Sequence, residues 1–78
     1  MNILRSPVES SAIVSIGYAP DTKSLELEFV GGSVYRYRDV PADIHAALIN
    51  AASKGAYFTS TIRPIYSHVR VRSAAPFP

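Results

Sequence analysis

The stretch LELEFVGGSVYRYR, residues 25–38, predicts a β-hairpin around which the rest of the fold is built. Apolar and charged residues alternate within it, and successive side chains of a strand point to opposite faces of a sheet. Glycine supplies the positive φ angles that hairpin turns require, which places the turn at Gly31 and Gly32. The loop length then decides which side chains share a face.

Two loop lengths give opposite orientations for the tyrosines and arginines of the second strand. A two-residue loop over 31–32 would place the arginines on the face of Leu25 and Leu27. A three-residue loop over 31–33 gives four pairs of matching character: Phe29 with Tyr35, Leu27 with Tyr37, Glu28 with Arg36, and Glu26 with Arg38. Opposed partners contribute roughly 0.2 to 1 kcal/mol each, whereas burying unpaired guanidinium groups is strongly unfavourable. We therefore predict the three-residue loop.

This register predicts a sheet with two faces of different character. Tyr35 and Tyr37 point to the core, with their hydroxyls near its edge. We interpret them, together with Tyr57 and Phe58 later in the chain, as a mainly structural aromatic motif. The alternative is that the tyrosine pair forms a platform on which bases stack.

Further strands flank the hairpin in the sequence. Residues 11–18, SAIVSIGY, are rich in β-branched residues, and alternation would place four side chains on one face: Ala12, Val14, Ile16 and Tyr18. With the hairpin this makes a three-stranded antiparallel sheet. Residues 67–72, SHVRVR, alternate valine with arginine and are a candidate fourth strand.

One or two helices follow the hairpin. Pro41 suits a first helical turn, and a stripe at helical spacing follows it: Ile44, Ala47, Leu48 and Ala51. Ser53 is a candidate N-cap for a second helix over 54–62, which Pro64 would end. The predicted fold class is α+β, with the helices packed on one face of the sheet.

The 78 residues suffice for one small domain, which we assign to 11–72. We expect residues 1–10 to be a flexible leader and residues 73–78 a flexible tail. Cysteine is absent, which excludes disulfides and thiolate metal sites. No signal-peptide pattern or membrane-length apolar run occurs, so we expect a soluble cytoplasmic protein without a membrane partner.

Basic residues concentrate in the second half of the chain. The net charge is only +2, yet no acidic residue follows Asp43. A basic surface of this kind suits a polyanion such as RNA or an acidic protein. The candidate nucleic-acid contacts are Arg36, Arg38, Lys54, Arg63, Arg70 and Arg72.

No motif in the chain predicts catalysis. His45 and His68 lack the spacing of a metal site, and no serine lies in a nucleophile elbow. Lys54 and Gly55 at a helix start could contact an anion, although capping and solubility explain them more simply. We therefore expect a non-enzyme without metal or cofactor.

The order of motifs along residues 10–66 resembles the KTSC domain. The match comprises the two serines and Ile-Gly-Tyr of the first strand, the Tyr-Arg-Tyr of the hairpin, Val-Pro before the helix, and SKGAYF followed by Arg63. This module is named for its occurrence at the C-terminus of some lysyl-tRNA synthetases and also occurs as a free-standing bacterial protein. The positions that match the motifs of the family are Tyr35, Tyr37, Lys54, Gly55, Tyr57, Phe58 and Arg63.

The resemblance implies a binding role, because RNA binding has been suggested for the family from its association with the synthetases. It implies no catalytic residue. Together with the basic second half, it makes an RNA-binding module, with a tRNA-like ligand, our first hypothesis. The alternative is a protein-protein interaction adaptor that uses the sheet face or an exposed strand edge. The sequence does not decide the oligomeric state.

Overall fold

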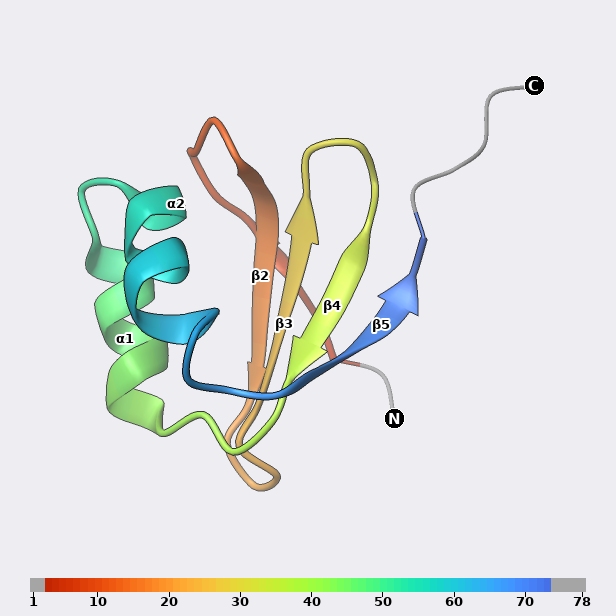
Figure 1. Ribbon diagram of the computed structural model, residues 1–78, viewed down its shortest axis with the longest axis vertical. Coiled ribbons are helices and arrows are strands. Elements are labelled where there is room, and N and C mark those ends of the chain that lie inside the picture. The colour runs from red at the N-terminus through yellow and green to blue at the C-terminus, as the bar shows by residue number, and fades with distance from the viewer. Residues whose placement is uncertain (1–2, 74–78) are drawn as a thin grey trace.

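The computed structural model describes residues 3–73 and contains a five-stranded antiparallel sheet in the order β1-β2-β3-β4-β5 (Figure 1). The strands are β1 Ser6–Pro7, β2 Ile13–Ala19, β3 Ser24–Phe29, β4 Val34–Tyr37 and β5 His68–Arg72. The helical segments are α1 Ala42–Asn50, α2 Lys54–Tyr57 and the π-helical turn η1 Phe58–Ile62. They lie on one face of the sheet, which confirms the α+β prediction.

The helix boundaries follow the predicted signals. Pro41 precedes the first residue of α1, where its missing N–H removes no hydrogen bond. The Ser53 hydroxyl accepts a hydrogen bond from the backbone N–H of Ala56 and so caps α2. The chain then widens into η1, in which the Arg63 N–H donates to the Phe58 carbonyl at 2.9 Å. This turn buries Phe58 and leaves Arg63 exposed at its end.

The sheet has one strand more than predicted at its first edge. The candidate fourth strand is present as β5, and β1 adds a fifth within the segment expected to be a leader. The chain before β1 crosses closely over Gly17, since a Cβ atom there would lie 2.4 Å from the Leu4 carbonyl oxygen. Glycine therefore permits this approach. Of the predicted tail, only Ser73 falls within the described residues.

The hairpin loop has the predicted three residues but begins one residue earlier, over 30–32. The Phe29 N–H donates to the Ser33 carbonyl at 2.9 Å, and Gly31 and Gly32 adopt φ angles of 103° and 100°. The four predicted pairs are therefore wrong in register by two positions. The observed pairs are Leu25 with Tyr37, Glu26 with Arg36, Leu27 with Tyr35, and Glu28 with Val34.

The predicted faces are confirmed because a shift of two positions preserves the alternation. Tyr37 is buried and Tyr35 half-buried on the helix side, while Arg36 lies on the outer face. Arg38 follows the end of β4 and is exposed, so its predicted pairing with Glu26 is wrong. Arg36 takes that position instead.

A network of charged side chains covers the outer face and joins four strands and the segment before β1. Arg36 donates to Glu26 at 2.9 Å, and Arg5 forms a second ion pair with the same carboxylate. Next to it, Glu28 accepts hydrogen bonds from Ser15 at 2.8 Å and from Arg72 at 3.2 Å. The Glu26 side chain is only 4% exposed, so burial of its charge depends on its two arginine partners.

A β-bulge in β2 changes the predicted orientation of its first residues. The pairing with β3 shifts between Ile13 and Ser15, so Val14 is 41% exposed while Ile13 is fully buried. Ala12 is exposed as well. The prediction that Val14 shares the face of Ile16 is therefore wrong, because the extra residue reverses the alternation. Ala12 precedes the bulge, and its side chain lies next to Gly55 of α2, on the helix side.

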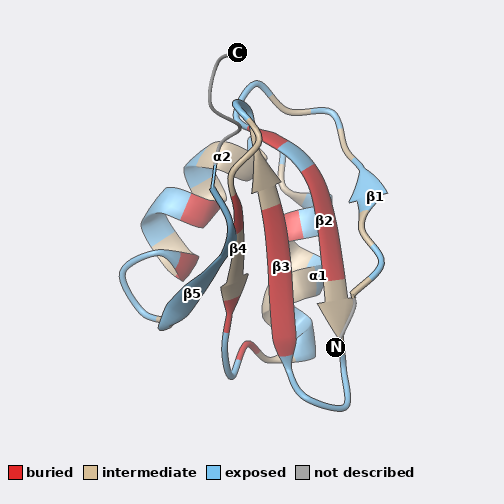
Figure 2. Cartoon of the chain, turned by 90° about the vertical axis from the view of Figure 1, so that its right-hand side faces the viewer, coloured by how far each residue is buried: buried red, intermediate tan, exposed pale blue. Residues whose placement is uncertain are grey.

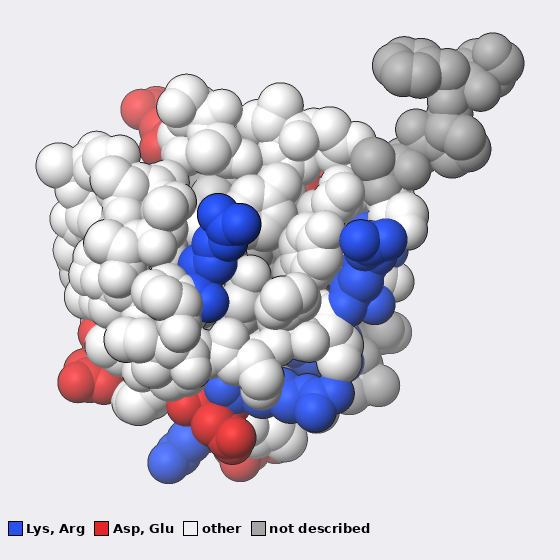
Figure 3. Space-filling model, viewed as in Figure 1, with Lys and Arg blue, Asp and Glu red and all other residues white. Residues whose placement is uncertain are grey.

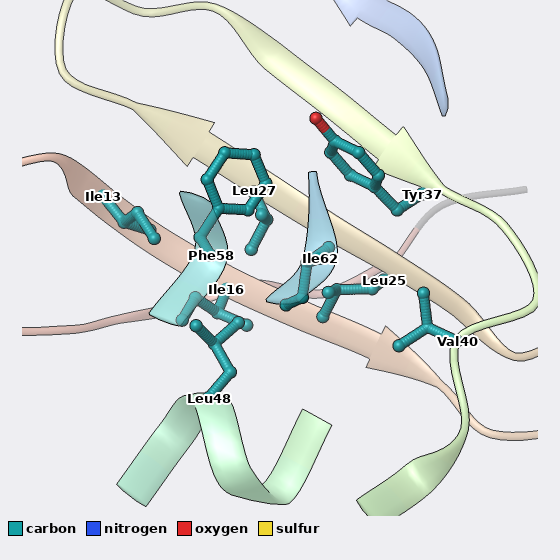
Figure 4. Close-up of a cluster of buried hydrophobic side chains, with 9 residues drawn as sticks. All are labelled: Ile13, Ile16, Leu25, Leu27, Tyr37, Val40, Leu48, Phe58 and Ile62. Carbon is teal, nitrogen blue, oxygen red and sulfur yellow. The ribbon is translucent and has the colours of Figure 1, made fainter. Parts of the chain in front are cut away.

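The hydrophobic core lies between the sheet and the helical layer (Figure 4). Its fully buried members come from β2, β3, the loop before α1, α1 itself and η1: Ile13, Leu25, Leu27, Val40, Leu48 and Ile62. Tyr37 and Phe58 close the core on the side of β4. Figure 2 shows the contrast along the sheet, with buried residues concentrated in β2 and β3 and an exposed β5.

Within residues 3–73, no helix combines the length and hydropathy needed to cross a lipid bilayer.

We predict that Glu26→Gln lowers the free energy of unfolding by roughly 1 to 3 kcal/mol, because two guanidinium groups lose a charged acceptor in a largely buried position. Urea denaturation measures this. The control is Glu9→Gln, which changes an exposed glutamate with no ion pair among the described residues and should shift stability by less than about 0.5 kcal/mol. Equal effects of the two substitutions would contradict a structural role for the network.

We also predict a loss of stability in mild acid that depends on His45. Its ring stacks on Tyr18 with centroids 4.6 Å apart, and burial lowers the pKa of His45 below the ordinary histidine value of 6.5. The unfolded chain therefore binds a proton at His45 more readily than the folded chain does. The contribution of neutral His45 to the free energy of unfolding is fully present above about pH 6.5 and decreases as the pH falls toward the folded-state pKa.

Thermal unfolding from roughly pH 7.5 to 5.5, a range centred on the ordinary histidine pKa of about 6.5, measures this dependence. His45→Gln should show a smaller decrease in Tm over this range than the unsubstituted chain. An unchanged decrease in His45→Gln would assign the effect to other groups.

Candidate functional site

A cleft of about 350 Å³ opens between β5 and the η1 turn, on the helix side of the sheet. Its aromatic lining consists of Phe29, Tyr35, Tyr37, Phe58 and His68. Two guanidinium groups, from Arg63 and Arg70, complete the lining. Figure 3 shows this face, on which separate basic side chains flank a hollow between the helical layer and the last strand.

The five rings form a closed circuit in which each contacts two neighbours. Phe29 contacts Tyr35 and Phe58, with centroid distances of 5.8 and 5.1 Å. Tyr37 contacts Phe58 at 5.4 Å and His68 at 5.0 Å. Tyr35 and His68 close the circuit at 5.4 Å. All five pairs are edge-to-face or tilted, an arrangement that fixes the orientation of each ring.

Strand alternation brings the sheet residues of the cleft together. Tyr35 and Tyr37 are two apart on β4, and β5 places Arg70 opposite Tyr35 and His68 opposite Tyr37. All four side chains therefore point to the same side of the sheet. Phe29 reaches this side from the end of β3.

The helical layer supplies the opposite wall. Phe58 begins η1, and Arg63 follows its last residue, so the wide π-helical turn presents both to the cleft. Such turns often occur at functional sites because they change the direction of individual side chains. Phe58 is buried against the core while Arg63 is exposed.

The electrostatic character of the cleft is positive. None of its lining residues is acidic, and no carboxylate among residues 3–73 forms an ion pair with Arg63 or Arg70. The Arg70 guanidinium lies 5.7 Å from the centroid of the Tyr35 ring, within the range of a cation–π contact. Two positive charges thus face a hollow that has an aromatic lining.

The Tyr37 hydroxyl is an available hydrogen-bond donor. Burial raises the pKa of the Tyr37 phenol. The charge of Arg63 lowers this pKa in part, and Tyr35 raises it further. The phenol therefore keeps its proton at neutral pH. None of the described residues forms a hydrogen bond with this hydroxyl, although the ring is almost fully buried.

These features suit a flat ligand that carries negative charge. Aromatic cages also bind quaternary ammonium groups, but two arginines and no carboxylate make this cleft unfavourable for a cation. Within residues 3–73, no cluster of three or more potential ligand side chains could hold a metal ion.

The structure divides the six predicted basic contacts among different places. Arg63 and Arg70 both line the cleft. Arg36 and Arg72 lie on the outer face, where they pair with Glu26 and Glu28. Arg38 is exposed beyond the end of β4, and the Lys54 ammonium approaches the Ala51 carbonyl at the start of α2. The six residues do not form one surface.

The aromatic motif contributes more to the candidate site than predicted. Tyr35, Tyr37 and Phe58 pack against or within the core and also line the cleft, whereas Tyr57 packs against the core only. Sequence reasoning missed Phe29 and His68 as site residues. The alternation of 67–72 carried the signal for His68, because it places His68 and Arg70 on one face.

A second hollow of about 560 Å³ lies between the segment around β1 and α1. Its lining includes Leu4, Tyr18, His45 and Ile49 and contains no lysine, arginine or carboxylate. It therefore offers apolar contact without a charged group to orient a ligand. The aromatic cleft is the stronger candidate site.

Comparison with known proteins identifies relatives of two kinds. An uncharacterised protein of Stutzerimonas stutzeri is 40% identical over 60 residues, which cover 77% of this chain and 84% of that protein. The lysine–tRNA ligase of a Nostoc species is 46% identical over 55 residues, which cover 70% of this chain and 10% of the ligase.

A solved structure has the same fold. The crystal structure of a KTSC domain protein from Yersinia pestis superposes with a TM-score of 0.84 at 38% sequence identity, over 91% of this chain and all of that one. The KTSC domain family itself matches residues 9–66, from the segment before β2 to the loop between η1 and β5. The chain therefore belongs to the KTSC domain family, as its motifs suggested.

Proposed function

We propose that this KTSC domain is a non-catalytic module that binds single-stranded RNA through the aromatic cleft. The observation that supports this proposal best is the combination, around one hollow, of five rings with two arginines that have no carboxylate partner among the described residues. Unpaired bases stack on aromatic side chains, and arginine contacts phosphate oxygens. Both elements of single-strand recognition are therefore present at one place.

The binding energy of such a contact can be estimated from its two parts. Stacking of a base on an aromatic side chain is worth about 1 to 3 kcal/mol, and each neutralised phosphate adds a salt-dependent contribution. Phe29 and Tyr35 are only half-buried, so part of each ring is accessible. We expect modest affinity from a site of this size.

The relatives support RNA over other polyanions. One relative is a lysine–tRNA ligase, whose substrate is a tRNA, and the matched region forms a small part of it. A tRNA-like ligand therefore remains part of this proposal.

The geometry narrows the set of proposed contacts. Arg63 and Arg70 are the primary phosphate contacts, because neither has a carboxylate partner among the described residues. The Arg36 and Arg72 charges are partly neutralised by Glu26 and Glu28 on the other face. Arg38 and Lys54 lie outside the cleft and contribute at most to its surroundings.

We predict that Arg63→Ala and Arg70→Ala each weaken binding of a fluorescent single-stranded RNA and each reduce the salt dependence by about 0.7 in the slope of log K against log salt. Fluorescence anisotropy at several salt concentrations measures both quantities. Tyr35→Leu, which keeps apolar volume but removes the ring, should weaken binding by roughly 5- to 100-fold.

Arg38→Ala is the matched control, since it removes an exposed arginine outside the cleft. It should change affinity little. Circular dichroism checks that each variant remains folded. Equal effects of Arg38→Ala and Arg63→Ala, or binding that is absent or indifferent to salt in the unsubstituted protein, would refute the proposal.

A second candidate function is protein binding through the edge of β5. All five residues of this strand are exposed, and it pairs with β4 on one side only. A strand edge of this kind can accept an extended peptide, and Arg70 and Arg72 would favour an acidic one. A nuclease-resistant, stoichiometric protein recovered by affinity purification would support this candidate. Recovery of nucleic acid alone would argue against it.

A further inference from the structure

We infer that the cleft recognises a single nucleotide with a terminal phosphate monoester, as found in a free nucleoside 5′-monophosphate or at the 5′ end of an RNA. This inference rests on the proposed function and specifies its ligand. It follows from the volume of the cleft, from the distribution of charge around it, and from the number of donors that face it.

The volume limits the ligand to one small unit. Pockets for small molecules range from about 300 to 1,000 Å³, and the cleft, at about 350 Å³, lies near the lower end. One base with its sugar and phosphate is a ligand of this class. A run of several stacked bases would extend beyond the ring circuit, which closes on itself through His68 and Phe58.

The charge distribution does not provide a track for a longer backbone. Proteins that follow single strands without sequence preference line a groove with positive charge along the backbone path. Here Arg36 and Arg72 lie on the opposite face of the sheet in ion pairs with glutamates. On the face of the cleft, uncharged atoms separate the basic side chains (Figure 3). The two cleft arginines therefore act locally.

The donors in the cleft suit a doubly charged group. Arg63 lines the hollow from the helical layer and Arg70 lines it from β5, so a phosphate in the hollow lies between two guanidinium charges. The Tyr37 hydroxyl adds a donor without a partner among residues 3–73. A phosphate monoester carries about −1.5 to −2 charge at neutral pH, whereas an internal phosphodiester carries only one negative charge. Two guanidinium groups and no carboxylate favour the monoester.

The rings account for the rest of the ligand. Phe29 and Tyr35 line the cleft and are only half-buried, so a base can cover their accessible surface. Inorganic phosphate would leave this surface unused, and a nucleoside would leave both arginines uncompensated. We therefore expect the two parts of a nucleotide to contribute together.

Titration of the isotope-labelled protein by NMR tests this inference with five probes: adenosine 5′-monophosphate, adenosine, inorganic phosphate, oligoadenylate with a 5′-phosphate, and oligoadenylate without one. We expect the monophosphate to bind at least tenfold more tightly than adenosine or phosphate. The phosphorylated oligonucleotide should match the monophosphate within a few-fold, with shifts confined to the cleft. Two local contacts predict a salt slope of only about −1.4.

Variants separate a specific site from general attraction. Arg63→Ala and Arg70→Ala should abolish the preference for the monophosphate over adenosine, whereas Arg38→Ala should retain it. Tyr35→Leu should weaken the binding of both adenosine and adenosine 5′-monophosphate.

The outcomes distinguish this inference from the proposed function. Affinity that increases steadily with oligonucleotide length and does not depend on the 5′-phosphate would overturn the single-nucleotide inference and leave RNA binding intact. Phosphate binding as tightly as the monophosphate would also overturn it, because the rings would then have no role. Absence of binding by every probe would overturn both proposals.

Discussion

The carboxylate of Glu26 is the constraint on which the arrangement of the sheet depends. It is almost fully buried on the outer face, and its charge is compensated by Arg5 from the chain before β1 and Arg36 from β4. A buried charge without partners is strongly unfavourable, so the strands must adopt the one register that brings both arginines to it. Once Arg36 lies on the outer face, Tyr35 and Tyr37 must lie on the other.

This separation of the two faces explains why the cleft has its character. Arg36 and Arg72 form ion pairs with glutamates on the outer face. The aromatic residues of the hairpin lie on the inner face, against the core. The η1 turn and β5 then enclose a hollow to which they contribute Arg63 and Arg70. The same alternation thus places the stabilising ion pairs on the outer face and the proposed binding site on the inner face.

The sequence sufficed to predict the faces of the hairpin because the alternation of 25–38 survives a shift of two positions. It did not predict the register, since local pairing favours a cation opposite each glutamate, whereas the structure places Glu28 opposite Val34. Arg5 and Arg72 are the further ion-pair partners of Glu26 and Glu28. Both lie far from the hairpin in sequence, so cross-strand pairing within the hairpin does not predict them. A two-residue strand containing Pro7 has no recognisable pattern, which explains why β1 was missed. The cleft could not be predicted because it requires the pairing of β5 with β4 and the π-helical widening of η1.

The position of β1 bears on how the domain can be joined to others. β1 and β5 occupy opposite edges of the five-stranded sheet, and adjacent strands are about 4.8 Å apart, so roughly 19 Å of sheet separates them. The segment before β1 turns back over Gly17, and its Arg5 pairs with Glu26 on the outer face, so this segment lies on the face opposite the aromatic hollow.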